Sequence, residues 1–420
     1  MTLHVKNVWL HDQGTVDMHL VEGKIQAIGP NLPSLPQATV LDVHHKAAVS
    51  GLVNGHTHAA MTLFRGYGDD MHLMPWLETR IWPAEAKLTQ EDVYWGTRLA
   101  CLEMIRSGTV AFEDMYWHFH GMAQAVEDSG LRAGVGAVMI DVAGEKQARA
   151  CQEQAVQFLE ESSRYSSRVQ FTLTPHAIYT VSPKSLSWSA TFSEQHQLPI
   201  HIHLSETAFE VSECIRQHGV RPAVHLDQQG LLTPRTILAH GVYLDDDELD
   251  LIAERGATIV SNPVSNLKLA VGGIFPYRRA AQRGIPIALG TDGAASNNNL
   301  DMFQDAKIFA LIQKHADNDP TSLTAAETWR VATGVAAPLI GQGSGLLKEG
   351  ENADILFLRR DLPEMTPHHD FISNVVYSAT GAVVDTVIVD GKVLMENRHI
   401  EGEEEILQEA SARAKVLCAT

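Results

Sequence analysis

Two histidines at a strand end are the first residues in this chain whose types and spacing suggest chemistry. His56 and His58 are separated by one residue at the end of an apolar run, and side chains on one face of a strand recur every two residues. Both imidazoles therefore point to the same side of the chain and can reach one ion. Such a pair also occurs in cores and loops, so taken alone it leaves metal binding and packing as alternatives.

Further polar residues follow other apolar runs of strand length. They are His176, His203, Glu206, His240 and Asp292. Barrel enzymes place their active sites at the C-terminal ends of the strands, so we expect these side chains to meet at one face. Imidazole nitrogens with one carboxylate suit zinc or iron, and a position left for water is typical of a catalytic metal site.

The elements that must position these residues alternate along the middle of the chain. Apolar runs of strand length are separated by helical patterns such as 90–106 and 245–255, which is typical of parallel βα units. Eight such runs predict an α/β fold with a (β/α)₈ TIM-type barrel. The runs are 47–54, 109–112, 133–140, 169–174, 199–204, 236–240, 257–261 and 286–291. The alternative, an open doubly wound sheet, would normally carry a glycine-rich phosphate loop after its first strand, where residues 55–58 read Gly-His-Thr-His.

Both ends of the chain read as β-structure. Residues 18–28 form a hairpin pattern around Glu22-Gly23, and residues 386–395 form a second one around Asp390-Gly391. We predict that the two ends come together as one small β-sandwich. The predicted domains are residues 1–50 for the N-terminal part of the sandwich, 51–345 for the barrel and 346–420 for the C-terminal part.

Composition narrows the function classes. The 420 residues suit a barrel with one accessory domain, and the net charge of −19 would repel a phosphate backbone or an anionic bilayer. We therefore expect neither a nucleic acid nor a membrane as partner, and no apolar run approaches the roughly 20 residues of a membrane-spanning helix. The four cysteines lack the spacings of a zinc knuckle or a disulfide framework, and the N-terminus lacks a signal-peptide pattern, which predicts a cytoplasmic protein.

Five motifs resemble a known family. They are Leu-Val-Asn-Gly-His-Thr-His at 52–58, His-Leu-Ser-Glu at 203–206, Ala-His-Gly at 239–241, Ser-Asn-Pro-Val-Ser-Asn at 261–266 and Gly-Thr-Asp-Gly-Ala-Ala-Ser-Asn-Asn-Asn at 290–299. They resemble the amidohydrolase superfamily, and within it the 5'-methylthioadenosine/S-adenosylhomocysteine deaminase family. The resemblance runs along nearly the whole chain, and it is compatible with a homodimer.

The resemblance implies a single divalent metal ion. Its implied ligands are His56, His58, His203 and Asp292. Zinc is the expected ion, with iron and manganese as alternatives. A binuclear site of the phosphotriesterase or dihydroorotase kind would need a bridging lysine after the fourth strand, and residues 169–176 contain none.

The resemblance also implies roles for the other polar residues. Glu206 and Asp292 would move protons, and His240 would orient the attacking hydroxide instead of binding metal. His176 and Glu85 would contact the nucleoside, with Glu85 accepting hydrogen bonds from the ribose hydroxyls; the other interpretation of Glu85 is a carboxylate on a helix surface. Some members of the family have a substrate-binding arginine after the third strand, and residues 137–144 contain no equivalent.

The implied activity is hydrolytic deamination of an adenosine-type nucleoside such as 5'-methylthioadenosine, S-adenosylhomocysteine or adenosine. Metal-activated water would attack the ring carbon, and ammonia would leave. The alternatives are a mononuclear deaminase or chlorohydrolase acting on guanine, 8-oxoguanine, cytosine or a triazine. A non-catalytic barrel used for binding or assembly is the alternative from another class; such a protein should lack a ligand or the acid Glu206, and all are present.

Overall fold

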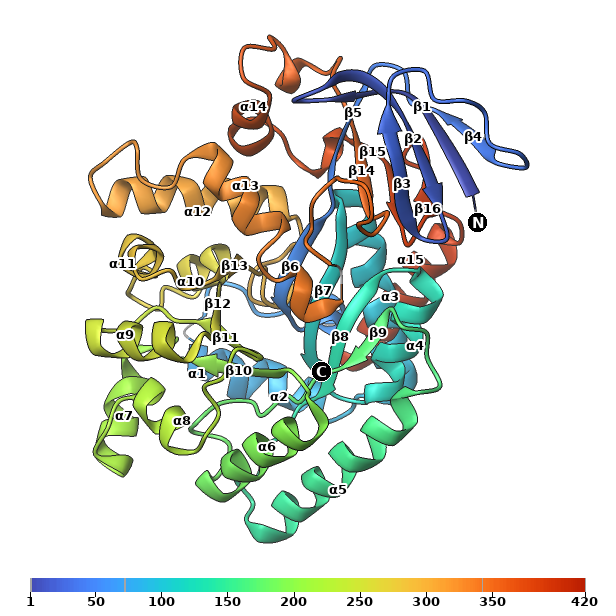
Figure 1. Ribbon diagram of the computed structural model, residues 1–420. Helices are drawn as coiled ribbons and strands as arrows, with labels where there is room; N and C mark the ends of the chain where they lie inside the picture. Colours follow the sequence, from blue (N-terminus) through green and yellow to red (C-terminus); the bar gives the residue numbers. More distant parts are fainter. Residues whose placement is uncertain (1, 72, 342, 420) are drawn as a thin grey trace.

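The computed structural model describes residues 2–71, 73–341 and 343–419. A ring of parallel strands stands in the middle of the molecule with helices outside it, and a separate β-layer lies above it in Figure 1. The fold is therefore α/β, as the alternation of strand and helix patterns predicts.

The barrel strands form two four-stranded parallel sheets, β6-β7-β8-β9 and β10-β11-β12-β13. One seam is closed where the backbone N–H of Leu173 donates to Pro199 at 3.0 Å and that of His201 donates to Leu173 at 2.9 Å. At the other seam, the N–H of Asp292 donates to the carbonyl of His56 at 3.0 Å. The strands are β6 (Leu52–Thr57), β7 (Thr109–Tyr116), β8 (Arg132–Ala137), β9 (Val169–Phe171), β10 (Ile200–Leu204), β11 (Thr236–His240), β12 (Thr258–Ser261) and β13 (Ile287–Leu289).

The run at 47–54, predicted as one barrel strand, is two strands in the structure. β5 (Lys46–Ser50) pairs with β14 in the terminal sheet, whereas β6 pairs with β7 in the barrel. Gly51 lies between them, and a Cβ there would come within 2.2 Å of the Val110 side chain. Only glycine allows this close approach, so the chain passes from one sheet to the other at Gly51.

Strands from both ends of the chain form one eight-stranded sheet, in the order β16-β15-β14-β5-β1-β2-β3, with β4 paired to β1. It encloses a hydrophobic core of its own, which includes Val5, Met18, Ile25 and Phe357. The prediction that the two ends come together is confirmed. The strands are β1 (Thr2–Leu10), β2 (Gly14–Val21), β3 (Lys24–Gly29), β4 (Thr39–Asp42), β5 (Lys46–Ser50), β14 (Ile355–Arg359), β15 (Val384–Val389) and β16 (Lys392–Met395).

Capping residues mark where the predicted helices begin. Ser182 caps α6, Asp245 caps α9 and Thr89 caps α3, each side chain accepting a hydrogen bond from the first turn. The longer helices are α3 (Gln90–Ser107), α4 (Phe119–Ser129), α5 (Glu145–Ser162), α6 (Pro183–His196), α7 (Ala208–His218), α8 (Pro222–Gln228), α9 (Asp246–Arg255), α12 (Met302–Ala316), α13 (Ala325–Thr333), α14 (Phe371–Tyr377) and α15 (Glu403–Leu417). The shorter ones are η1 (Ala59–Phe64), α1 (Leu73–Trp76), η2 (Leu77–Ile81), α2 (Trp82–Glu85), α10 (Pro263–Lys268), α11 (Tyr277–Gln282), η3 (Ala337–Ile340), η4 (Pro363–Met365) and η5 (Gly381–Val383).

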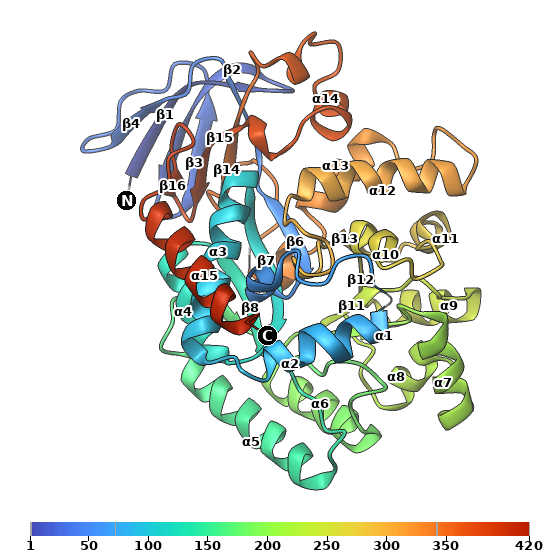
Figure 2. The ribbon, with the colours of Figure 1, turned by 180° about the vertical axis from the view of Figure 1, so that it is seen from behind.

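An ion-pair cluster and a helix join the barrel to the C-terminal part of the chain. The buried Arg132 of β8 donates to Asp354 and Asp390 of the terminal sheet, both at 2.9 Å. The last helix, α15, packs on α3 of the barrel. The segment with α1 and α2, which follows the first barrel strand, lies in the foreground of Figure 2. The domain boundaries at residues 50 and 345 stay predictions.

Among the described residues, no helix combines the length and the apolar character needed to cross a bilayer.

Candidate metal centre and active site

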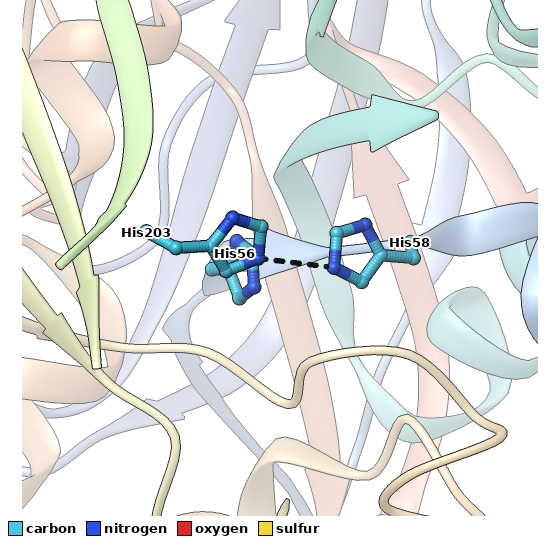
Figure 3. A group of neighbouring side chains, drawn as sticks. All are labelled: His56, His58 and His203. Atoms are coloured by element: carbon cyan, nitrogen blue, oxygen red, sulfur yellow. Dashed lines mark hydrogen bonds between the residues drawn. The ribbon is translucent and has the colours of Figure 1, made fainter. Parts of the chain in front are cut away.

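Three imidazoles and one carboxylate converge at the C-terminal ends of the barrel strands. The ligand atoms of His56, His58 and His203 all lie within 4.8 Å of one another, and Figure 3 shows the rings of His203 and His58 pointing toward each other. The Nε2 atoms of His58 and His203 are 3.3 Å apart. Asp292 follows β13, and its Oδ1 lies 3.4 Å from the Nε2 of both His56 and His58. The structure thus brings together all four predicted ligands.

Hydrogen bonds on the far side of the rings fix how the histidines face this centre. The Nδ1 of His58 contacts the carbonyl of Met115 at 2.6 Å, and the Nδ1 of His203 contacts the carbonyl of His176 at 2.7 Å. A carbonyl can only accept, so the proton of each neutral ring sits on Nδ1 and the Nε2 lone pair faces the centre. Burial lowers the pKa of His56 to about 3 and that of His203 well below its ordinary value, so both are neutral at pH 7.

The Asp292 carboxylate is held with one oxygen toward the histidines. Its Oδ2 accepts hydrogen bonds from the hydroxyls of Ser265 at 2.6 Å and Ser296 at 2.8 Å, and the N–H of Gly293 donates to Oδ1 at 2.8 Å. Burial acts to raise the pKa of Asp292, but the histidines outweigh it and hold that pKa well below its ordinary value. The residue has a φ of 63°, a backbone conformation that is unusual outside glycine and occurs often at functional sites.

The donor set fits a divalent ion. His56 Nε2 is fully buried and has no hydrogen-bond partner among the described residues, although a polar atom left alone in a protein interior is costly. Three neutral imidazoles and one ionised carboxylate are ligands that zinc and iron accept. The four side chains would hold one divalent ion at this position.

His240 and Glu206 lie beside the four ligands. The Nδ2 of Asn266 donates to the Nδ1 of His240 at 2.9 Å, which places the proton of the neutral imidazole on Nε2. Burial lowers the pKa of His240, which favours this neutral form. The Nε2 is 3.9 Å from a Glu206 carboxylate oxygen. His240 thus presents an N–H donor next to a carboxyl group.

The Glu206 turn is built by a second glutamate. Both oxygens of Glu210 accept backbone N–H groups, from Ser205 at 2.8 Å and from Glu206 at 2.9 Å, and Ser205 has a φ of 50°. Burial, and then the nearby charge of Asp292, raise the pKa of Glu206 to about 8. A carboxyl group that keeps its proton at pH 7 can act as a general acid.

The two predicted nucleoside contacts border the same centre. The His176 ring lies 4.7 Å from the His203 ring, and burial lowers the pKa of His176 to about 3. Glu85 at the end of α2 accepts a hydrogen bond from the Tyr116 hydroxyl at 2.7 Å, and the Tyr116 ring lies 6.3 Å from that of His58. Glu85 is thus held inward by Tyr116.

Sequence reasoning missed the residues that support the site. Ser265, Asn266 and Ser296 lie within the quoted motifs, yet their roles depend on contacts across different strands. Tyr116 ends β7 without a recognisable motif. Several apolar residues that follow His58 in the sequence are buried in the core: Met61, Leu63, Phe64 and Trp76. Trp82, three residues before Glu85, is 48% exposed.

Comparison with known proteins decides the family. The family model described as "Amidohydrolase family" matches residues 47–394, which include every strand of the barrel. The chain belongs to the amidohydrolase family. The resemblance inferred from the five motifs is confirmed.

Three relatives of this amidohydrolase carry deaminase names. It is 48% identical over 376 residues to a 5'-deoxyadenosine deaminase of Methanoregula boonei, covering 89% of this chain and 85% of that protein. It is 43% identical over 413 residues to 5-methylthioadenosine/S-adenosylhomocysteine deaminase 1 of Archaeoglobus fulgidus, covering 97% of both. The crystal structure of an adenosine deaminase from Xanthomonas campestris with bound zinc superimposes with a TM-score of 0.93 at 32% identity, covering 100% and 98% of the two chains.

Proposed function

We propose that this amidohydrolase is a zinc-dependent deaminase that hydrolyses the 6-amino group of adenosine-type nucleosides and releases ammonia. The observation that carries the proposal is the convergence of His56, His58, His203 and Asp292 beside the carboxyl group of Glu206, whose pKa is raised. The relatives named as deaminases of 5'-deoxyadenosine, 5-methylthioadenosine and adenosine support the same substrate class, and the zinc in the Xanthomonas structure supports that ion.

Each polar side chain has a part in this reaction. A divalent ion held here would lower the pKa of a bound water to about 7, so that a nucleophile is available at neutral pH. Asp292, whose Oδ1 lies among the histidines, would accept a proton from the attacking water, and the Nε2–H of His240 would orient the attacking oxygen. Glu206 donates its proton to the ring nitrogen next to the attacked carbon. The proton taken by Asp292 would pass to the amino group, which leaves as ammonia, and the added hydroxyl would return its proton to Glu206 as the carbonyl forms.

The substrate class is tested by a screen of purified, zinc-loaded protein against adenosine-type nucleosides, guanine, 8-oxoguanine, cytosine and amino- and chlorotriazines. Deamination changes the ultraviolet spectrum of the base, so each reaction can be followed directly. We expect turnover of the adenosine-type nucleosides and of none of the others. Turnover confined to a free base or to a triazine would replace the proposed substrate while leaving the metal chemistry in place.

Glu85→Gln is expected to weaken nucleoside binding rather than chemistry. If Glu85 accepts hydrogen bonds from the ribose hydroxyls, the neutral amide loses about 1.5–3 kcal/mol, which raises KM by about 10–100-fold at nearly constant kcat. Steady-state kinetics with adenosine measure both constants. A 2',3'-dideoxynucleoside is the matched control, because the two proteins should bind it alike; an unchanged KM for adenosine would contradict the ribose contact.

The reaction should slow in alkaline solution. The pKa of Glu206 is raised to about 8, so the acid form predominates below that pH and is lost as the pH rises through it. We expect kcat to fall tenfold per pH unit above a midpoint near that value. A profile of kcat between roughly pH 6 and pH 10 checks this, with circular dichroism to show that the fold persists. A rate that stays level to the alkaline end would contradict an acid role for Glu206.

We also propose the reducing cytoplasm as the location. Cys101, Cys151, Cys214 and Cys418 are all free thiols in the structure. Chains in oxidising compartments usually pair their cysteines, so four unpaired thiols favour a reducing one.

A further inference from the structure

The barrel interior beneath the metal centre holds two polar side chains that the proposed reaction does not use. Glu113 of β7 and His201 of β10 are both fully buried, each with a side chain 0% exposed. The Nδ1 of His201 and the Oε2 of Glu113 are 4.0 Å apart, and neither atom has a hydrogen-bond partner among the described residues. Buried polar atoms of this kind call for a structural or functional reason.

His201 connects this pair to a metal ligand. Its Nε2 lies 2.8 Å from the Nδ1 of His56, so His201 stands between this ligand and Glu113. The other two ligand histidines rest on the carbonyls of Met115 and His176. His56 differs from them, because its support is a side chain that can donate as well as accept.

The contact between the two rings therefore makes the tautomer of His201 decide which nitrogen of His56 offers its lone pair to the ion. If His201 carries its proton on Nδ1, its Nε2 accepts from His56, and the His56 Nε2 lone pair faces the ion. If the proton is on Nε2, His201 donates and His56 must carry its own proton on the metal side. The Oε2 of Glu113 lies 4.0 Å from the Nδ1 of His201, and when it acts as an acceptor it favours the first arrangement.

The barrel wall is shaped to admit Glu113. A Cβ at Gly134 of the neighbouring strand β8 would lie 2.1 Å from Glu113 Oε1, so glycine leaves the space that this carboxylate fills. The Thr172 hydroxyl donates to the same oxygen at 3.4 Å, which leaves Oε2 on the side of His201. The glycine and the threonine together fix which carboxylate oxygen faces the histidine.

We infer that Glu113 and His201 are positioning residues that hold His56 in the orientation and tautomer needed to bind the metal ion. The inference rests on the proposed metal site and deepens it. Residues that orient a ligand in this way commonly change metal affinity by about 10–100-fold when they are replaced. Neither residue needs to touch the substrate.

The test is zinc affinity, measured by competition between the metal-free protein and a chromophoric chelator. His201→Leu is expected to raise the zinc Kd by about 10–100-fold. His201→Gln, whose amide reaches the position of Nε2, should recover most of that loss. For Glu113, the apolar Glu113→Leu should weaken binding more than Glu113→Gln, which keeps an acceptor oxygen.

His225→Leu is the matched control. His225 is 2% exposed with both ring nitrogens unpartnered among the described residues, yet it lies on α8 outside the metal centre, so its loss should leave the zinc Kd unchanged. Thermal unfolding of each variant with and without zinc separates a structural role from a positioning role. A purely structural role lowers the Tm of the metal-free and the zinc-loaded protein equally. A positioning role reduces the rise in Tm that zinc causes.

The outcomes distinguish this inference from the proposed function. An unchanged zinc Kd in His201→Leu, or equal changes in His201→Leu and His225→Leu, would overturn the positioning role alone. Failure of the unaltered protein to take up zinc in the same titration would overturn the metal site and this inference with it. If His201→Leu does not fold, the comparison of Glu113→Gln with Glu113→Leu decides the question in the same assay.

Discussion

Glu206→Gln should lower kcat for adenosine by about 10²–10⁴-fold while the protein keeps its metal and its fold. The amide matches the carboxylic acid in size, so the turn that Glu210 holds through Ser205 and Glu206 is undisturbed. The amide has no acidic proton to give to the ring nitrogen. Without that proton, the ring nitrogen accepts the negative charge poorly as the tetrahedral carbon forms. Ammonia release by the zinc-loaded variant measures the loss.

The same exchange at Glu213 provides the control. Glu213 lies on α7 and pairs with Arg216, whose side chain is 68% exposed, so Glu213→Gln should leave both kcat and zinc content unchanged. Near-normal ammonia release from the metal-loaded Glu206→Gln protein would remove the proposed acid role. The alkaline fall in kcat should also disappear in this variant, because the group that titrates is gone.

The meeting of the polar residues could be predicted because their spacing and their place in the chain carry the geometry. His56 and His58 share a strand face through the two-residue repeat, and parallel strands bring their C-terminal ends to one side of a barrel. Those two rules bring His176, His203, His240 and Asp292 to the same face, and the resemblance to the amidohydrolase family implied which of them bind the ion. The structure brings the side chains of all four predicted ligands together.

The strand boundary at Gly51 could not be predicted from the pattern. Residues 47–54 form one mostly apolar run, and a buried strand of the terminal sheet has the same composition as a buried strand of the barrel. The break between β5 and β6 falls at Gly51, where a Cβ would clash with the side chain of Val110. That contact joins residues far apart in sequence, so periodicity does not report it.

The backbone turns at the site were equally hidden. Ser205, His240 and Asp292 all have positive φ values, at 50°, 76° and 63°, and none of them is glycine. Local preference argues against this conformation for such residues. Side-chain hydrogen bonds accompany it at two of the three positions: Glu210 accepts from the N–H of Ser205, and Ser265 and Ser296 donate to the Asp292 carboxylate. Local backbone preferences therefore fail to predict the conformation at positions where the site needs a positive φ to direct a side chain.

Asp292→Asn should separate metal binding from proton transfer. The amide oxygen can still approach the ion, but the negative charge is lost, so zinc affinity should fall. Excess zinc should restore the metal content measured by atomic emission. It should not restore turnover, because a neutral amide cannot take the proton of the attacking water, and kcat should stay at least about 10²-fold below the unaltered protein.

Ser296→Ala is the matched variant for this experiment. It removes one of the two hydroxyls on Oδ2 but keeps the carboxylate and its Oδ1, so it should bind zinc and lose far less activity than Asp292→Asn. Full recovery of kcat in zinc-saturated Asp292→Asn would show that Asp292 serves only as a ligand. The proton of the water would then have to pass to Glu206, which in its ionised form is the remaining carboxylate beside His240.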